Sequence, residues 1–272
     1  MEGIDRSTSR GRLAPQDLAD LRAAGTVRRY PVGDVLLREG DPSSVVFALL
    51  AGGVKVTKSS PDGRQVLLEL RREGELVGEL SAIDRSTRSA TVEAMTEVEA
   101  AVVPGDRFRA LLASRAGLSN HVLIGVVARL REASERQLEL GTVDVVGRVC
   151  RRLCELAAAD GRRTTEGIVV RSPLSQQELA DWAGIPRDGV VRAFTELRRN
   201  GWLATGRQRI VILDPEAVRS RGGPDRGRRT GGGPSSRPRS AQDRRWPDTG
   251  SGSKGTPCRC SSSNATSPSS SR

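Results

Sequence analysis

The chain has 272 residues, which is enough for one or two domains with cores of their own. It contains no apolar run near the roughly 18 residues of a membrane-spanning helix, and residues 1–12 lack the apolar segment of a secretory signal. We therefore expect a cytoplasmic protein. Four cysteines are too few for a disulfide framework in a chain of this length, and they are Cys150, Cys154, Cys258 and Cys260.

The net charge of +11 is concentrated at the C-terminal end. Residues 219–272 hold 12 Lys or Arg and 3 Asp or Glu, which is +9, so only +2 remains for residues 1–218. Gly, Pro, Ser and Arg dominate from Arg221 onward, and we expect residues 219–272 to be a disordered basic tail. The tail is either passive or adds salt-sensitive, nonspecific affinity for DNA.

The first part of the chain alternates short apolar runs with turn sequences. Residues 1–26 read as a helical lead-in, with a short helix over residues 15–24. From residue 27, apolar strands are separated by turns such as Gly52-Gly53 and Pro61-Asp62-Gly63, and a short helix follows over residues 105–113. This pattern predicts a small antiparallel barrel or jelly roll over residues 27–113.

A long helix is predicted within residues 114–141. Its apolar residues recur at steps of three and four, which indicates a heptad-like stripe that includes Leu123, Leu130 and Leu140. A helix of about 24 residues spans about 36 Å, more than a small barrel can cover. We expect the free stripe to pair with a second copy of the chain. The alternative is a core helix within one larger domain.

Residues 142–218 have the pattern of a helix-turn-helix. Asp144 suits the N-cap of a helix that runs to Ala159, and Ser175 with Glu178 forms a capping box on the next helix. A tight turn at residues 183–185 precedes a helix that starts at Pro186, with Val190, Val191, Phe194 and Leu197 expected to pack. Six arginines between residues 187 and 209 suit DNA contacts, whereas the alternative is a plain helical hairpin with a solvated charged face.

The segment Gly74 to Val92 suggests a site for a sugar phosphate. Gly78-Glu79-Leu80 begins a short helical turn, whose backbone N–H groups suit an anion. Arg88 offers a planar fork of donors that fits phosphate. Glu79, when ionised, accepts a hydrogen bond from a hydroxyl such as that of a ribose. The alternative is a turn with a surface salt bridge between Glu79 and Arg88.

This segment resembles the phosphate-binding cassette of cyclic-nucleotide-binding domains, in particular the cyclic AMP receptor protein and fumarate–nitrate regulator family of bacterial transcription factors. The family pattern is G-E-L, seven or eight residues, then R-S-A, and residues 78–80 and 88–90 match it. The resemblance covers roughly residues 27–214. It implies an α+β fold with an N-terminal β-roll, a long dimerisation helix and a C-terminal winged helix-turn-helix.

The resemblance also implies site residues. Ala133 stands where a family threonine contacts adenine, so the identity of the base stays open. Pro186 and Gly189 replace residues whose hydroxyls usually hold phosphates. The residues implied for the cyclic nucleotide are Gly78, Glu79, Leu80, Arg88, Ser89, Arg129 and Ser134. Those implied for DNA are Gln177, Arg187, Asp188 and Arg192. The arginine cluster of residues 187–209 adds Arg198, Arg199, Arg207 and Arg209 as candidate DNA contacts.

The function implied is that of a homodimeric transcription regulator under the control of a cyclic nucleotide, with cyclic AMP favoured. Its partners would be double-stranded DNA with a palindromic operator, a second copy of the chain, and RNA polymerase, with no membrane. We expect no catalytic residue, no metal and no tightly bound cofactor. One alternative is a regulator of the same fold that needs no nucleotide, and another is a nucleotide-sensing regulatory subunit of an enzyme.

Overall fold

The structure is a computed structural model, and it describes residues 12–42, 44–171, 174–206 and 209–223. The chain divides into two units, residues 1–228 and 229–272, and the description concerns the first. The predicted tail, together with Cys258 and Cys260, lies outside the described residues, apart from its first five positions. Arg207 lies outside them as well.

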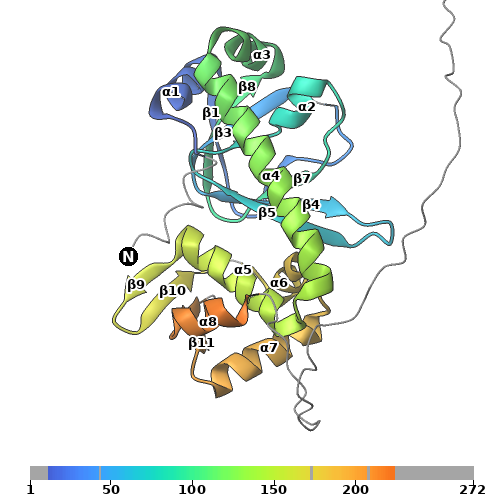
Figure 1. Cartoon of the computed structure of the whole chain (residues 1–272). Helices are drawn as coiled ribbons and strands as arrows, with labels where there is room; N and C mark the ends of the chain where they lie inside the picture. Colours follow the sequence, from blue (N-terminus) through green and yellow to red (C-terminus); the bar gives the residue numbers. More distant parts are fainter. Residues whose placement is uncertain (1–11, 43, 172–173, 207–208, 224–272) are drawn as a thin grey trace, which may run out of the picture. The chain divides into compact units, whose positions relative to one another are not determined.

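The N-terminal half folds into two four-stranded antiparallel sheets that form a β-roll, as predicted (Figure 1). One sheet has the strand order β1-β8-β3-β6 and the other β2-β7-β4-β5. The strands are β1 (Thr26–Tyr30), β2 (Val35–Leu37), β3 (Val45–Ala51), β4 (Gly53–Ser59), β5 (Gln65–Arg72), β6 (Leu76–Val77), β7 (Thr91–Ala94) and β8 (Val98–Pro104). The helices of this half are α1 (Pro15–Ala24), α2 (Glu79–Asp84) and α3 (Gly105–Ser114).

Strand β3 is buried on both faces, which explains its continuous apolar run. Phe47 and Leu49 belong to the cluster between the two sheets. Val46 and Ala48 point the other way, into a second cluster. This cluster contains Leu21 of α1, Phe108 of α3, and Leu118 and Val122 of the long helix that follows α3. The sheet that contains β3 therefore has a helical cover on its outer side.

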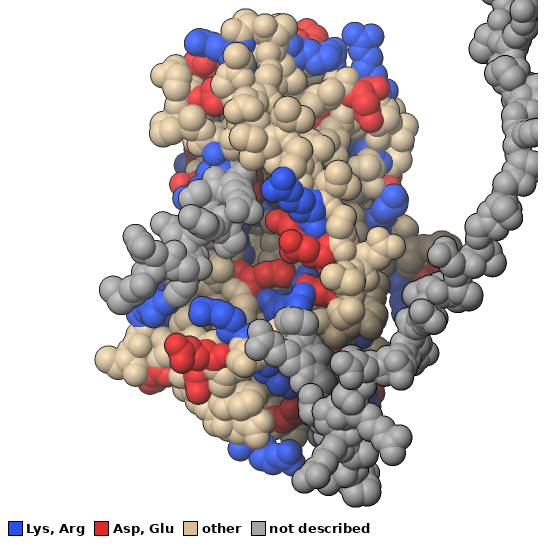
Figure 2. Space-filling model, viewed as in Figure 1, with Lys and Arg blue, Asp and Glu red and all other residues tan. Residues whose placement is uncertain are grey.

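Helix α4 (Ala116–Thr142) has 27 residues and is about 40 Å long. Figure 1 shows it running from α3 along the roll to the C-terminal half. It buries only Leu118, Val122 and Glu139. Large apolar side chains stay exposed along its length, and Figure 2 shows few charges over its first half. The exposed apolar residues of α4 are Leu123, Ile124, Val127, Leu130, Leu138 and Leu140. A core helix of a single larger domain would have buried these residues, so this alternative does not describe the chain.

The C-terminal half contains a helical core beside a four-stranded sheet of order β11-β12-β10-β9. Its core includes Leu153, Leu156, Trp182, Phe194 and Leu197. The strands are β9 (Arg162–Thr164), β10 (Gly167–Arg171), β11 (Leu203–Gly206) and β12 (Arg209–Ile212). The helices are α5 (Val145–Asp160), α6 (Gln176–Ala183), α7 (Arg187–Arg199) and α8 (Pro215–Arg221). A helix-turn-helix followed by a hairpin confirms the predicted fold class.

The helix-turn-helix forms for local reasons that the sequence carries. Both halves of the Ser175–Glu178 capping box are present at the start of α6. Gly184 ends α6 in the left-handed conformation, at φ 62°, which glycine adopts at little cost. Pro186 is the N-cap of α7 rather than its first helical residue. Val191 was expected to pack with its neighbours, and this prediction was wrong because its side chain faces solvent.

Helix α8 was not predicted, and it moves the boundary of the folded part from residue 218 to at least Arg221. Asp214 caps it by accepting a hydrogen bond from the backbone N–H of Ala217 at 2.9 Å. Val218 is fully buried in the C-terminal core. Arg221 forms two hydrogen bonds with the carboxylate of Asp144, at 2.8 and 2.6 Å. These bonds lower the pKa of Asp144.

Among the described residues no single helix is long and apolar enough to cross a membrane. Helices α3 and α4 taken together pass that test by length and composition, and they meet at a bend of 108°. Cys150 is buried and free, and burial raises its pKa to about 12. A thiol in this state packs as a small apolar side chain.

Candidate effector site and nucleic-acid interface

The phosphate cassette predicted from the sequence is built around Gly78, whose backbone conformation strongly favours glycine. Gly78 has a φ of 81° and directly precedes α2. A Cβ atom at this position would lie 2.6 Å from Nη1 of Arg88 and 2.8 Å from Cδ1 of Leu37. The positive φ and the close approach of Arg88 therefore both require glycine here.

Arg88 is buried and binds the turn itself. Its side chain is enclosed, with 4% of the residue exposed. Nη1 donates to the carbonyl oxygen of Gly78 at 2.8 Å and to Oγ of Ser81 at 2.9 Å, and Nη2 donates to the carbonyl oxygen of Val45. Burial lowers the pKa of this guanidinium, although arginine stays charged in proteins. Arg88 thus braces the start of α2, while Leu80 and Ser89 are exposed beside it.

Glu79 pairs with Arg129 of α4 rather than with Arg88. The distance from Nη2 of Arg129 to Oε1 of Glu79 is 2.6 Å, and only 4% of Glu79 is exposed. The surface salt bridge considered as an alternative from the sequence is therefore not the pair that forms. Because Arg129 lies midway along α4, this ion pair links the cassette directly to the long helix.

Arg71 of β5 is a further charged residue at this site, and sequence reasoning missed it. It forms ion pairs with Glu69 at 2.9 Å and with Glu75 at 3.1 Å. Burial acts to lower the pKa of Arg71, but the negative charges of Glu69, Glu75 and Glu79 outweigh it and raise the pKa. The sequence does carry a signal for this pair: Glu69 and Arg71 are two residues apart in a strand, so their side chains lie on the same face of the sheet.

These residues enclose a cavity of about 60 Å³. Its lining includes Glu79, Arg88, Ser89, Arg129 and Arg71. Pockets for small organic ligands measure roughly 300–1,000 Å³, so a nucleotide would enter only if α4 or the cassette moved. Ser134 does not line the cavity, because it is exposed on α4 and its Oγ donates to the carbonyl oxygen of Leu130 at 3.0 Å.

The exposed face of α7 carries the residues predicted to read DNA. Arg187 lies in the first turn of the helix, and Asp188 forms an ion pair with Arg192 at 2.6 Å. Val191 lies between Asp188 and Arg192 in the sequence, and it is 44% exposed. Its spacing of four residues from Arg187 and three from Asp188 puts it on the same face as these residues, which is the signal that sequence reasoning overlooked.

The remaining residues predicted for DNA surround this face. Nε2 of Gln177, in the first turn of α6, donates to Asp181 at 2.9 Å. Arg198 donates to Oγ1 of Thr205 on β11 at 3.1 Å, which ties the end of α7 to the hairpin. Arg209 pairs with Glu166 at 3.1 Å, and Arg199 is exposed. The structure therefore brings most of the predicted residues to one helix and the hairpin after it.

Comparison with known proteins identifies both halves. Residues 27–115 match the cyclic nucleotide-binding domain, and residues 147–221 match the Crp-like helix-turn-helix domain. The CRP-like cAMP-activated global transcriptional regulator of Mycobacterium tuberculosis is 30% identical over 192 residues, which cover 71% of this chain and 86% of that protein. The chain belongs to the CRP/FNR family of transcription regulators.

Other members of the family are also similar. The Global nitrogen regulator of Synechococcus elongatus is 28% identical over 194 residues, covering 71% of this chain and 87% of that protein. Among solved structures, the c-di-GMP responsive global regulator CLP of Xanthomonas campestris has a TM-score of 0.65 at 25% identity. That match covers 74% of this chain and all of the CLP chain. A CRP-family regulator from Thermus thermophilus has a TM-score of 0.62 at 27% identity, covering 72% and 96%.

The contact between Gly78 and Arg88 in this regulator predicts a specific effect of Gly78→Ala. The new methyl group would collide with Arg88 in addition to straining the backbone. Gly33→Ala is the matched control, because Gly33 has a φ of 88° and an added Cβ would meet nothing within 4 Å. We expect Gly33→Ala to lower the free energy of unfolding by about 1 kcal/mol and Gly78→Ala by at least about 1 kcal/mol more. Chemical denaturation measures both, and equal losses would mean that the guanidinium of Arg88 moves aside from the new methyl group without cost.

Proposed function

We propose that this regulator is controlled by a cyclic nucleotide that binds at the cassette. The observation that carries the proposal is the ion pair between Glu79 and Arg129, which places a hydroxyl acceptor of the cassette under the control of α4. Cyclic AMP is the candidate effector from the family resemblance, and it would act as a diffusible ligand rather than a tightly bound cofactor. We propose a cytoplasmic location and no catalytic activity.

The ion pair suggests how binding would be transmitted. A ribose hydroxyl that donates to Glu79 would compete with Arg129 for the same carboxylate oxygens. A phosphate group near Arg88 would add negative charge to which Arg129 could turn instead. Either change shifts α4, and a difference in affinity between two positions of α4 is what allosteric control requires.

The base of the effector is a separate question. Relatives of this chain carry names that refer to different effectors, cAMP for the Mycobacterium tuberculosis protein and c-di-GMP for CLP. Ala133 carries no side-chain hydrogen-bonding group for an adenine amino group. The charged residues Arg71 and Glu69 line the cavity together with Val56 and Leu37. We therefore propose cyclic AMP as the first candidate effector and treat guanine-containing cyclic nucleotides as alternatives.

The first test is calorimetric titration with cyclic AMP, cyclic GMP and c-di-GMP. We expect one of them to bind the wild-type protein, and Arg88→Gln to weaken binding roughly 10- to 100-fold, the equivalent of a charge-assisted contact of about 1.5–3 kcal/mol. Arg85→Gln is the control, because Arg85 is an exposed arginine of the same loop. If none of the three nucleotides binds wild type at millimolar concentration, nucleotide control is wrong.

A nucleotide-independent regulator is the second candidate, and two observations favour it. The guanidinium of Arg88 already donates to three protein acceptors, and the cavity measures only about 60 Å³. A site of this kind can serve as a structural brace without any ligand. The titration separates the two candidates, because only the first one predicts saturable binding.

We further propose that the regulator is a homodimer in which α4 pairs with its copy. The exposed leucines of α4 form a stripe, and Leu130 is 67% exposed in the single chain. Contiguous exposed apolar surface of this kind marks an interface. Ser134 lies on the same helix and is also exposed, so in a dimer it would be available to the partner's effector site.

A single charge in the stripe should disrupt the dimer. Leu130→Asp would bury an unpaired carboxylate at the helix pair, and we expect light scattering to show a monomer at micromolar concentration. Val32→Asp is the matched control, because Val32 is 64% exposed and lies in the turn between β1 and β2, outside the stripe of α4. A dimeric Leu130→Asp protein, or a monomeric wild type, would contradict this arrangement.

The target we propose is double-stranded DNA, read by α7 in the major groove as a palindromic operator. Arg187 would donate to guanine, and Asp188 would accept from a cytosine amino group once released from Arg192. Val191 would contact a thymine methyl group, which is the apolar feature of the major groove. Arg198 and Arg199, near the end of α7, would bind phosphates together with Arg209. Contact with RNA polymerase is proposed on the family resemblance alone.

Selection of bound sequences from a random DNA pool tests this target. We expect wild type to enrich a two-fold symmetric motif with half-sites about one helical turn, roughly 34–36 Å, apart. Arg187→Ala should relax the preference at one base pair in each half-site, at a cost of about 1–3 kcal/mol. Arg199→Ala is the control and should weaken all sequences alike. An unchanged motif with Arg187→Ala would show that Arg187 does not read a base.

A further inference from the structure

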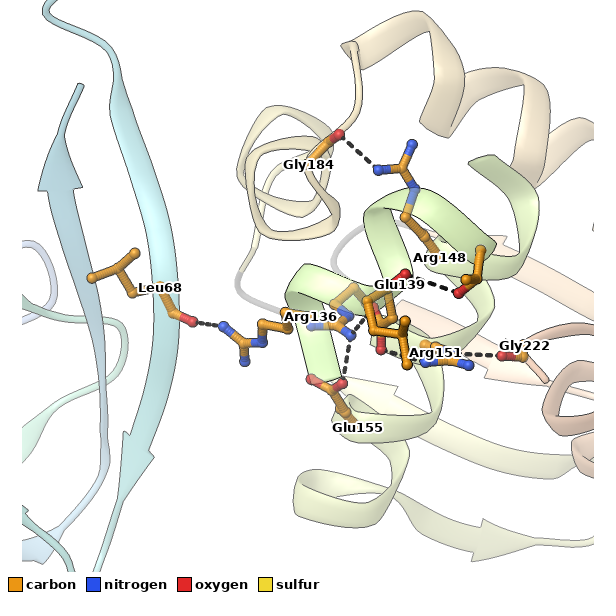
Figure 3. A network of polar contacts seen from close by, with 11 residues as sticks. Leu68, Arg136, Glu139, Arg148, Arg151, Glu155, Gly184 and Gly222 are labelled. Atoms are coloured by element: carbon orange, nitrogen blue, oxygen red, sulfur yellow. Dashed lines mark hydrogen bonds and ion pairs between the residues drawn. The ribbon is translucent and has the colours of Figure 1, made fainter. Parts of the chain in front are cut away.

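The junction between α4 and α5 contains a buried network of ion pairs that the proposed effector and DNA sites do not explain (Figure 3). Helix α4 ends at Thr142 and α5 begins at Val145, so only Val143 and Asp144 separate the helix proposed to dimerise from the DNA-binding half. The direction in which the chain leaves α4 therefore sets where the recognition helix α7 points.

Glu139 is the centre of this network. It lies in the last turn of α4, and it is one of three buried residues of that helix. Its Oε1 accepts from Nη1 of Arg151 at 2.6 Å, and its Oε2 accepts from Nη2 of Arg152 at 2.8 Å. We call these three residues, Glu139, Arg151 and Arg152, the elbow clasp. One carboxylate of α4 thus holds two consecutive arginines of α5.

Arg152 connects the elbow clasp to the helix-turn-helix. Only 1% of this residue is exposed, which is rare for arginine. Its guanidinium lies 5.5 Å from the ring centroid of Trp182 on α6, and Nη2 also pairs with Glu155 at 2.9 Å. Burial lowers the pKa of Arg152 and raises the pKa of Glu155. A buried cation of this kind tolerates few positions of its partners.

Three further arginine contacts, two from α5 and one from α4, connect the junction to neighbouring elements. Arg151 also donates from Nε to the carbonyl oxygen of Gly222, at the end of α8. Arg148 donates to the carbonyl oxygen of Gly184, in the turn that precedes α7, at 3.2 Å. Arg136 of α4 donates to the carbonyl oxygen of Leu68 on β5. Figure 3 shows Arg148 reaching Gly184, Arg151 reaching Gly222 and Arg136 reaching Leu68.

The charged residues of the elbow clasp suit a role in fixing the angle between α4 and α5 better than a role in adding stability. Apolar side chains of similar volume would stabilise this junction as well as or better than buried charges, because burying charges has a large desolvation cost. What an arginine–carboxylate contact adds is direction, since its hydrogen bonds form only in a narrow range of geometries. A clasp made of charges therefore suits a junction whose angle matters more than its stability.

We propose that the elbow clasp is a positioning element that holds α5, and with it α7, at one angle to α4, and so sets the spacing of the two recognition helices in a dimer. The second half of this statement rests on the proposed dimer and its palindromic operator. Arg129 and Glu139 lie ten residues apart on α4, about 15 Å. A shift of α4 at the effector site would therefore reach the clasp through one continuous helix.

The test replaces the buried pair of the clasp with apolar groups, and the partners left behind, Arg151 and Glu155, have side chains that are 27% and 42% exposed. In the double variant Glu139→Leu with Arg152→Leu, both charges become apolar groups of similar size, a change that commonly leaves stability intact. Glu135→Leu is the matched control, because Glu135 is exposed one turn earlier on α4. Light scattering and circular dichroism first establish that both proteins are folded and have the same oligomeric state as wild type.

The first measurement is the tolerance of operator spacing. One base pair is added or removed between the half-sites of the operator selected by wild type. We expect wild type and Glu135→Leu to bind the altered operators about tenfold or more weakly. We expect the double variant to lose no more than about twofold, because its recognition helices can adjust. Equal discrimination by a folded double variant would overturn the proposal.

The second measurement needs neither DNA nor nucleotide. Hydrogen exchange at the amides of residues 140–147 reports on opening of the junction. We expect exchange there to be about tenfold faster in the double variant than in wild type or Glu135→Leu, with no change at residues 45–58 of the roll. Unchanged exchange at the junction would overturn the rigid clasp. If wild type selected no palindrome, the operator model would fail, while this measurement would still decide the clasp.

Discussion

The ion pair between Glu79 and Arg129 is the contact on which the arrangement of the candidate effector site depends. Glu79 belongs to the turn that Gly78 and Arg88 hold in place, and Arg129 belongs to the long helix. A carboxylate at this place can accept from a hydroxyl or from a guanidinium, and the two compete. The same residue that makes the cassette suitable for a sugar phosphate therefore also determines how close α4 lies to the roll.

Helix α4 combines three roles along its length. Its first turns pack on the roll through Leu118 and Val122, its middle carries Arg129 and the exposed leucines, and its last turn carries Glu139. Because a helix is stiff over this distance, a displacement of α4 at one of these places also displaces the others. The elbow clasp is consistent with that role, since it joins the end of α4 to a helix that contacts both Trp182 and the turn before α7.

Much of the architecture was predictable because local rules and global fold agree. The capping box at Ser175, the glycine that ends α6 and the N-cap at Asp144 are determined within a few residues of the chain. The short strands and the long helix follow from apolar periodicity, and the spacing between Gly78 and Arg88 identifies the cassette. Val191 was predicted incorrectly because its apolar character suggested burial, whereas its position in the helical turn puts it on the outer face.

The sequence by itself determined the family, the order of elements up to α7 and most of the residues that gather at the cassette and on α7, because these depend on spacing along the chain. Only the tertiary structure decided which charges pair. Arg88 donates inward to Gly78, Ser81 and Val45, Glu79 takes Arg129 from 50 residues away, and Arg221 reaches Asp144 across 77 residues. No spacing pattern in the sequence singles out Glu139, Arg151 or Arg152. Ion pairs are decided by which side chains share a buried space, and periodicity does not carry that information.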